Sequence, residues 1–321
     1  MNRKLIILTI ILLGVVSGGI GGGYLFVKAQ KILPYYGQLT KTRLRAAVNL
    51  QPEAQKSAQY RGSQSCAECH VEQHEAWRVS FHAKMIQPVK ESPEAIVGDF
   101  VTLPADANFS LEDIAYTIGG KFKQRYMLRD DLDGAEDYVI GDYQWNVELQ
   151  RWQPYHPYKD WYSEGFPQDN KLVHTSRTCD GCHFVGFMSL EQRIEPAIAC
   201  ESCHGPGSAH VDDPRDETIY KATDADPHRA TEVCLQCHMR NRDRRLASRS
   251  LVDLFGDVRD YPQGFVPGRP LQDYKMQTPF EPGKETGEFY GNGVGKKNRM
   301  QGNEFVRSVM YKHGITCVNC H

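Results

Sequence analysis

The stretch Cys200-Glu-Ser-Cys203-His204 decides the architecture of this chain, because its pattern, Cys-x-x-Cys-His, occurs five times. All ten cysteines lie in these copies, so none is left over for a disulfide. The cysteine pairs are Cys66 and Cys69, Cys179 and Cys182, Cys200 and Cys203, Cys234 and Cys237, and Cys317 and Cys320. The histidines that follow them are His70, His183, His204, His238 and His321.

This spacing is the attachment signature of a c-type haem. Two thiols one helical turn apart can bond to the two vinyl groups of one haem, while the next imidazole ligates the iron. Zinc also binds cysteine and histidine, but it does not need a histidine directly after the second cysteine in every copy. The five motifs therefore predict five covalently attached haems.

Composition narrows the class of protein further. The chain has 321 residues, of which 40% are hydrophobic, so it is long enough for a large folded domain. Its 38 Lys and Arg residues against 40 Asp and Glu residues give a net charge of −2. No general positive field is present, so we expect no nucleic-acid partner.

The N-terminal region predicts a membrane anchor. Residues 5–27 carry no charge and would be about 34 Å long as a helix, which spans a bilayer. We expect a single-pass transmembrane helix within residues 1–28, followed by a stalk and linker over residues 29–59. The alternative is a cleaved signal peptide. Small residues at Gly14, Gly18 and Gly22 could let two such helices pack as in a homodimer, the alternative being that glycine simply recurs in membrane helices.

Haem attachment also predicts the compartment, because thioether bonds to haem form outside the cytoplasm. Both interpretations of the N-terminal segment place residues 60–321, the predicted pentahaem domain, on the periplasmic or extracellular side of the cell membrane. We expect a mostly α-helical and irregular multihaem cytochrome c fold in which the haems form the core.

A long stretch without cysteine separates the first two motifs. Its short β-rich segments and the Asp133-Gly134 turn signal predict a small antiparallel β insert over residues 98–153. We expect a run of aromatic residues to pack against haem faces, the alternative being an electron-transfer or substrate surface; the run is Trp145, Trp152, Tyr155, Tyr158, Trp161 and Tyr162. Only 16 residues separate His183 from Cys200, so the second and third haems should be neighbours.

The first motif predicts a helix with a defined start. Ser65 and Glu68 have the spacing of a capping box, which would open a helix in which His70, His74 and Trp77 share one face. On that helix His74 would lie on the same side of the haem as His70. It is therefore expected to be a packing residue, not the second ligand of that iron.

Seven histidines remain beyond the five in the motifs, enough for a second axial imidazole on every iron. They are His74, His82, His156, His174, His210, His228 and His313. His174 is a candidate distal ligand because it lies five residues before Cys179; His156 and His228 are weaker candidates. The methionines near the motifs, Met85, Met188, Met239 and Met310, are the competing ligand type.

Three segments carry a resemblance to a known superfamily. Residues 60–82 look like the opening of multihaem c-type cytochromes related to hydroxylamine oxidoreductase, pentahaem nitrite reductase and the nitrifier tetrahaem cytochrome. Residues 200–210 are similar to its Cys-x-x-Cys-His-Gly-Pro-Gly-x-x-His element, and residues 313–321 to its His-x-x-x-Cys-x-x-Cys-His element. The resemblance covers residues 60–321 and implies that His82, His210 and His313 are distal ligands.

Two departures limit what the resemblance implies. Such relatives continue beyond the motif that ends at His321, so a C-terminally truncated fragment is one interpretation. The Cys-x-x-Cys-Lys motif of many nitrite reductases is missing, so catalytic roles are not carried over. The leading hypothesis is an electron carrier served by redox partner proteins or a quinol-linked donor. The alternative is an oxidoreductase that acts on a small nitrogen or sulfur compound at one open haem.

Overall fold

The computed structural model describes residues 51–132, 134–155, 174–187, 192–243, 261–277, 280–297 and 299–321. The predicted transmembrane helix, the stalk up to residue 50, His156, Tyr158, Trp161, Tyr162 and Met188 lie outside these residues. Within the described ranges, no helix is long and apolar enough to cross a membrane.

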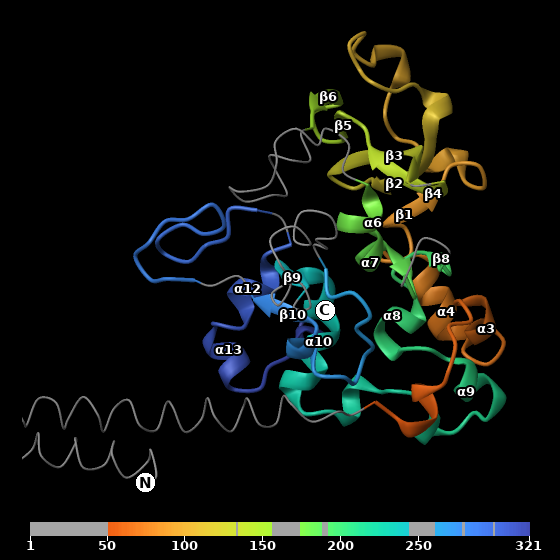
Figure 1. Ribbon diagram of the computed structural model, residues 1–321, viewed down its shortest axis with the longest axis vertical. Coiled ribbons are helices and arrows are strands. Elements are labelled where there is room, and N and C mark those ends of the chain that lie inside the picture. The colour runs from red at the N-terminus through yellow and green to blue at the C-terminus, as the bar shows by residue number, and fades with distance from the viewer. Residues whose placement is uncertain are drawn as a thin grey trace, which may run out of the picture. The chain divides into compact units, whose positions relative to one another are not determined.

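A six-stranded antiparallel sheet dominates the first half of the described chain (Figure 1). Its strands are β1 (Ile86–Pro88), β2 (Ile114–Gly119), β3 (Lys123–Leu132), β4 (Ala135–Ile140), β5 (Tyr143–Asn146) and β6 (Arg151–Pro154). The order is β1-β2-β3-β5-β6, and β4 also pairs with β3. An antiparallel sheet therefore lies where the sequence predicts the insert. It also includes β1, which precedes residue 98 in the sequence.

The long strand β3 holds the sheet together by pairing with two strands along the same edge. Its first part pairs with β5, with Lys123 opposite Asn146, and its later part pairs with β4. The β3–β4 hairpin closes where Leu132 pairs with Ala135, and Gly134 adopts a φ of 84°. Glycine tolerates this left-handed conformation, so the predicted turn position is confirmed.

The sheet builds a core of its own side chains. One cluster joins Phe109, Ile114, Tyr126, Leu128, Val139 and Trp145, with Trp152 packed against it. The rings of Trp145 and Trp152 meet edge to face, with centroids 5.4 Å apart. The expectation that these two tryptophans pack against haem faces is therefore wrong. Pairing of Trp145 with Trp152 across β5 and β6 directs both rings into the sheet's core.

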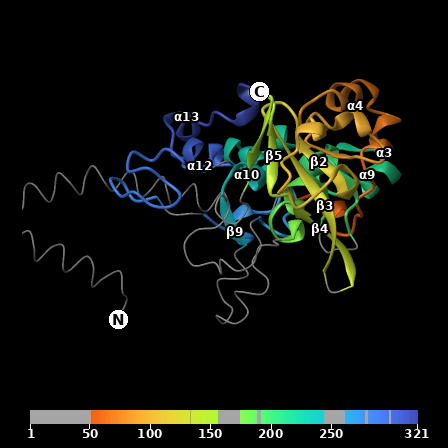
Figure 2. The ribbon, with the colours of Figure 1, turned by 90° about the horizontal axis from the view of Figure 1, so that it is seen from above.

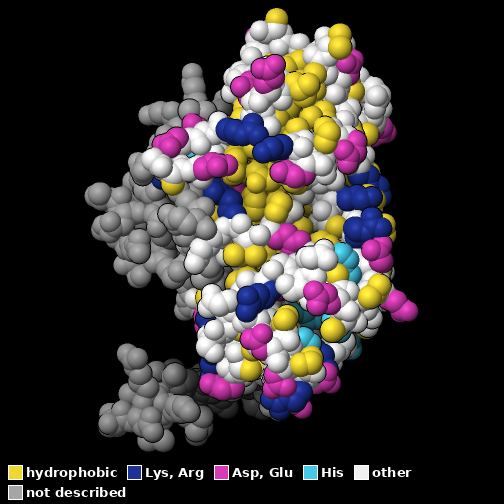
Figure 3. All heavy atoms as spheres, turned by 90° about the vertical axis from the view of Figure 1, so that its right-hand side faces the viewer, with side chains coloured by type: hydrophobic (Ala, Val, Ile, Leu, Met, Phe, Trp, Pro, Cys, Tyr) yellow, Lys and Arg dark blue, Asp and Glu magenta, His cyan; other side chains and the backbone are white. Residues whose placement is uncertain are grey.

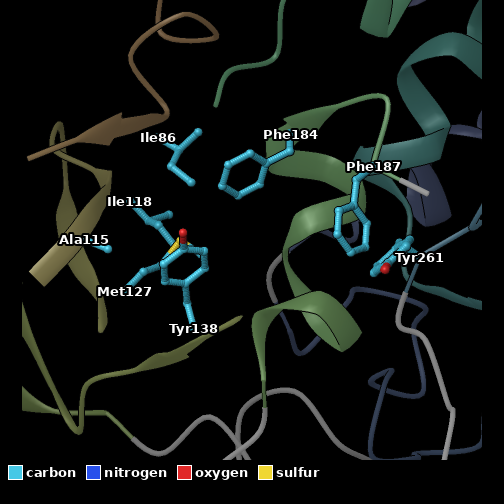
Figure 4. Close-up of a cluster of buried hydrophobic side chains, with 8 residues drawn as sticks. All are labelled: Ile86, Ala115, Ile118, Met127, Tyr138, Phe184, Phe187 and Tyr261. Carbon is cyan, nitrogen blue, oxygen red and sulfur yellow. The ribbon is translucent and has the colours of Figure 1, made fainter. Parts of the chain in front are cut away.

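A second cluster joins the sheet to the second Cys-x-x-Cys-His motif (Figure 4). The sheet contributes Ile86, Ala115, Ile118, Met127 and Tyr138, while Phe184, Phe187 and Tyr261 come from segments outside it. Phe184 directly follows the motif histidine, and its ring points toward Ile86. Burial of these apolar rings fixes the second motif against the sheet.

The rest of the described chain is built from short helices and irregular segments (Figures 1 and 2). The helices are α3 (Gln64–Ala67), α4 (Val71–Arg78), α6 (Thr175–Thr178), α7 (Asp180–His183), α8 (Cys200–His204), α9 (Ser208–Asp212), α10 (Pro227–His238), α12 (Gln301–Phe305) and α13 (Val309–Lys312). The two-stranded pairs are β7 (Phe184–Val185) with β8 (Glu195–Pro196), and β9 (Asn241–Asp243) with β10 (Lys275–Gln277). Helices this short are not stable by themselves, so tertiary contacts must hold them.

The first motif differs from its predicted local structure. Ser65 forms no capping box with Glu68; its hydroxyl donates to the Arg61 carbonyl at 3.4 Å. The N-cap is Ser63, whose N–H donates to Glu195 at 2.9 Å, and His70 interrupts the helix before α4. A distant carboxylate thus sets the start of α3 and overrides the local signal.

Candidate haem-binding site

The motif backbones form single helical turns that bring the two thiols to one side. In the first motif the N–H of His70 donates to the carbonyl of Cys66 at 2.9 Å. The same bond joins His183 to Cys179 at 3.1 Å and His321 to Cys317 at 3.2 Å. This turn is the local geometry that attachment of both cysteines to one haem requires.

Two histidine side chains are oriented by polar contacts of their Nδ1 atoms. His204 Nδ1 lies 3.0 Å from the Tyr220 carbonyl. His210 Nδ1 lies 3.1 Å from the Arg215 carbonyl and 3.0 Å from Thr218 Oγ1. Metal-ligating histidines are commonly held in this way, because the bond fixes the tautomer and leaves Nε2 free to ligate.

Two pairs of histidine rings face one another at a separation suited to a metal between them. The ring centroids of His70 and His210 are 6.2 Å apart, with ring planes 21° from parallel; those of His82 and His238 are also 6.2 Å apart, with ring planes tilted by 59°. Two imidazoles on opposite sides of one metal, with bonds of about 2 Å, place their centroids about 6 Å apart. Histidine side chains also gather on the lower half of one face of the molecule (Figure 3). The donor set therefore fits haem iron.

The second motif contains a histidine, His183, whose ring nitrogen Nδ1 is buried. Burial, together with the positive charges of Arg299 and Arg125, lowers the pKa of His183 to about 4. The imidazole is therefore neutral at physiological pH, which is the form that binds iron. The Nδ1 atom of His183 is buried and has no hydrogen-bond partner among the described residues.

Thiols from different motifs lie against each other. Before haem attachment, the interaction between the Cys66 and Cys200 thiols raises the pKa of Cys66 and lowers that of Cys200. A similar interaction with Cys234 lowers the pKa of the unattached Cys317 thiol to about 7. The rings of His228 and Tyr311 bring the same two segments together, with centroids 4.4 Å apart. The first motif is thus a neighbour of the third, and the fourth is a neighbour of the fifth.

The fourth motif also contacts the second and the third. A hydrogen bond from the Cys182 side chain raises the pKa of Cys237, and Cys182 Sγ lies 3.9 Å from the Gln236 carbonyl. Gln236 Nε2 donates to the Ser202 carbonyl at 2.8 Å. The second and third motifs are close together in the sequence. That proximity does not predict that each of them contacts the fourth motif.

A buried carboxylate in the third motif holds the backbone that directly precedes the first motif. Glu201 is 3% exposed and accepts backbone N–H groups from Arg61 at 3.0 Å, Gly62 at 2.8 Å and Gly207 at 2.7 Å. Burial raises its pKa, and the three donors partly offset this shift. Glu201 therefore fixes the spacing of the first and third motifs.

A carboxylate inside the second motif anchors that motif to the sheet. Arg193 Nη2 lies 2.7 Å from Asp180 and 2.6 Å from Asp137 of β4, and both carboxylates are fully buried. Burial raises the pKa of Asp180 to about 6, while Arg193 opposes that shift. Sequence reasoning missed Asp180 and Glu201, although an acidic residue between the two cysteines of a motif was a visible signal.

The remaining predicted ligands have no facing imidazole in the described part of the chain. His174 Nε2 lies 3.3 Å from Asp130 Oδ2 on β3. His313 is the C-cap of α13. His228 packs edge to face on Tyr311, with centroids 4.4 Å apart. His74 packs against Trp77 at 5.3 Å, which agrees with its expected packing role.

Comparisons with known proteins agree with this site. A family model described as cytochrome c554 and c-prime matches residues 65–106. The crystal structure of the outer cell wall cytochrome OcwA is similar, with 25% sequence identity and a TM-score of 0.63 over 82% of this chain and 56% of that one. An undecaheme cytochrome from the S-layer of Carboxydothermus ferrireducens has 20% identity and a TM-score of 0.40 over 59% of this chain and 26% of that one. The search of curated proteins gives no match.

These findings support a general class. The chain spans little more than half of the outer cell wall cytochrome, so that comparison covers only part of the larger protein. The five motifs, the family match over residues 65–106 and the fold together are those of a multihaem c-type cytochrome.

Proposed function

We propose that the chain carries electrons through five haems, one attached to each Cys-x-x-Cys-His motif. The observation that carries this proposal is the two pairs of histidine rings with centroids 6.2 Å apart, because bis-histidine ligation is typical of haems that transfer electrons without binding substrate. When bound, the haems supply the one-electron chemistry. The protein positions them and sets their potentials through axial ligands, burial and hydrogen bonds.

The ring pairs lead to two ligand assignments. His210 serves as the distal ligand of the first-motif haem, opposite His70, and His82 serves as that of the fourth-motif haem, opposite His238. His313 and His174 are proposed as distal ligands of other haems. For His174 this role requires the imidazole to leave Asp130, now 3.3 Å away.

The contacts between motifs support a branched route for electrons. The first motif adjoins the third through Glu201, and the segment of the fourth motif adjoins those of the second, third and fifth. The fourth motif is therefore the junction of the proposed route, and loss of its haem would separate the others into disconnected groups.

The proposed setting is the periplasmic or extracellular side of the cell membrane. Residues 5–27 would form the single-pass anchor, and the glycines at positions 14, 18 and 22 would allow two such helices to pair. The proposed electron donor is a redox partner protein or a quinol-linked donor. Attachment of haem outside the cytoplasm and the charge-free N-terminal run support this setting.

The test combines haem counting with ligand substitution. Mass spectrometry of the denatured chain should show five haem additions. His210→Met should keep all five and convert one bis-histidine centre to His/Met ligation, with a higher potential and a changed electron paramagnetic resonance spectrum. His74→Met is the matched control, because His74 packs on Trp77, and its spectrum should match that of the unsubstituted protein. Fewer than five haems, or an unchanged His210→Met spectrum, would contradict the proposal.

Carbon monoxide distinguishes the carrier from an enzyme with an open haem. Haems with two imidazoles should bind carbon monoxide slowly or not at all, so the Soret band of the reduced protein should barely shift. Rapid binding of one equivalent, together with turnover of a small nitrogen or sulfur compound, would favour the oxidoreductase.

A further inference from the structure

Two exposed phenylalanines and three lysines gather at one end of the sheet. Lys121 Nζ lies 4.4 Å from the centroid of the Phe81 ring and 5.2 Å from that of Phe122. Phe81 is 62% exposed and Phe122 is 68% exposed. Since one ammonium group contacts both rings, the turn after α4 and the β2–β3 hairpin form a single surface.

The strand register places two more lysines beside this group. The N–H of Gly119 donates to the Met85 carbonyl at 2.7 Å, so Lys84 lies next to the β2–β3 hairpin. Lys123 opens β3 directly after Phe122. Phe81, Lys84, Lys121, Phe122 and Lys123 are called the lysine–phenylalanine surface below.

The charge of this surface is not neutralised within the described chain. Lys84, Lys121 and Lys123 are exposed, and none forms an ion pair with a carboxylate of the described residues. Other exposed lysines do, such as Lys56 with Glu53 at 2.6 Å and Lys284 with Glu281 at 3.0 Å. A local positive charge therefore stands on a protein whose net charge is −2.

The composition of the surface resembles the core and rim of a protein interface. Aromatic side chains are enriched at the centre of such interfaces, and charged groups at the rim steer the partner. Exposed aromatic groups rimmed by polar residues are typical of interaction sites. Positive charge without a partner in the chain is complementary to an acidic protein surface.

The surface also adjoins a proposed haem ligand. Phe81 immediately precedes His82, whose ring faces that of His238 at 6.2 Å. Under the proposed function these two histidines hold the haem at the junction of the route. A protein docked on Phe81 would therefore lie near the one haem that adjoins three others.

We propose that the lysine–phenylalanine surface docks an acidic one-electron carrier protein that exchanges electrons with the fourth-motif haem. This inference rests on the proposed function. One electron passes between the cofactor of the partner and the haem iron, which changes between Fe(III) and Fe(II), and no bond is made or broken. A protein fits better than a membrane, because the surface is built from a turn and a hairpin and not from an amphipathic helix.

The test uses the full holoprotein and reduced plant-type ferredoxin, an acidic one-electron carrier, as the probe. The second-order rate of haem reduction is measured by stopped flow at several salt concentrations. The variant Lys84→Glu/Lys121→Glu/Lys123→Glu should slow the reaction at low salt by about 10-fold or more and remove its acceleration at low salt. The matched control Lys56→Glu/Lys90→Glu/Lys284→Glu makes the same change in net charge elsewhere and should slow it by less than about 3-fold.

A second variant tests the aromatic rings without a change in charge. Phe81→Ser/Phe122→Ser should lower the rate at high salt, where steering is screened. Equal slowing by the lysine variant and its control, or no slowing by either variant, would overturn the docking surface. If vesicles of phosphatidylserine and phosphatidylcholine, but not ferredoxin, bound in a lysine-dependent way, the surface would be a membrane contact and the proposal would be wrong.

Haem counts keep this test separate from the proposed function. Every variant should retain five haems by mass and the same spectrum after reduction by dithionite. Five haems with an unchanged ferredoxin rate would reject the docking surface alone. Fewer than five haems in the unsubstituted protein would reject the proposed function itself.

Discussion

The sheet and the haem-motif segments differ in what forms their hydrophobic cores. The sheet packs Tyr126, Met127 and Trp145 at 0 to 3% exposure and needs no other group to form a core. The motif segments are short helical turns held by buried carboxylates, notably Glu201 and Asp180. Side chains supply the core of the first region, whereas we expect haems to supply most of the core of the second.

The largest expected effect is therefore the consequence of haem loss. The full chain, produced without haem attachment, should keep slow amide exchange in β2, β3 and β4 and lose it in α8 and α10, because only the sheet has a complete core of side chains. Peptide-level hydrogen exchange of the apo and holo chains measures this difference. Equal loss of protection in both regions would show that the sheet also depends on haem.

The next effect concerns the joint between the two regions. Arg193→Ala leaves Asp137 and Asp180 buried without their shared cation, which should cost about 3 to 5 kcal/mol in the free energy of unfolding. Urea unfolding of the holoprotein measures the change. Arg215→Ala removes an exposed ion pair with Asp213 and should leave the midpoint unchanged. Equal effects of the two substitutions would mean that Arg193 does not join the regions.

A smaller effect is expected at the carboxylate between the first and third motifs. Glu201→Gln removes the charge and one acceptor oxygen, so one of the N–H groups of Arg61, Gly62 or Gly207 loses its partner. The expected cost is about 2 kcal/mol. The same unfolding measurement applies, with the potential of the first-motif haem as a second readout. Wild-type stability together with a wild-type potential would show that Glu201 is not an anchor.

The smallest effect tests the cap within the fifth motif. Asn319 accepts the Thr316 N–H at 2.7 Å and its hydroxyl at 2.9 Å, which forms the capping box absent at Ser65. Asn319→Ala should lower the free energy of unfolding by about 1 kcal/mol, since a cap of this kind contributes that amount. Haem count should stay at five. A loss of several kcal/mol would instead place Asn319 among the anchors.

Local sequence signals succeeded where the neighbouring residues alone decide the outcome. Gly134 closes the β3–β4 hairpin where the turn was predicted, because glycine tolerates the positive φ that the hairpin needs. The Ser65 capping box failed because Glu195, distant in sequence, binds Ser63 and sets an earlier helix start. The predicted packing of Trp145 and Trp152 against haem was wrong because these residues pair across β5 and β6, which local sequence patterns do not show.

The sequence by itself determined the chemistry of this protein: ten cysteines in five identical motifs specify c-type haem attachment, since the thiols and the next imidazole act within one helical turn. Only the tertiary structure decided which motifs and histidines meet. His70 faces His210, His82 faces His238, and the fourth motif adjoins three others. The physical reason is that these contacts join segments far apart in the chain. Such contacts depend on the packing of the whole fold and leave no periodic pattern in the sequence.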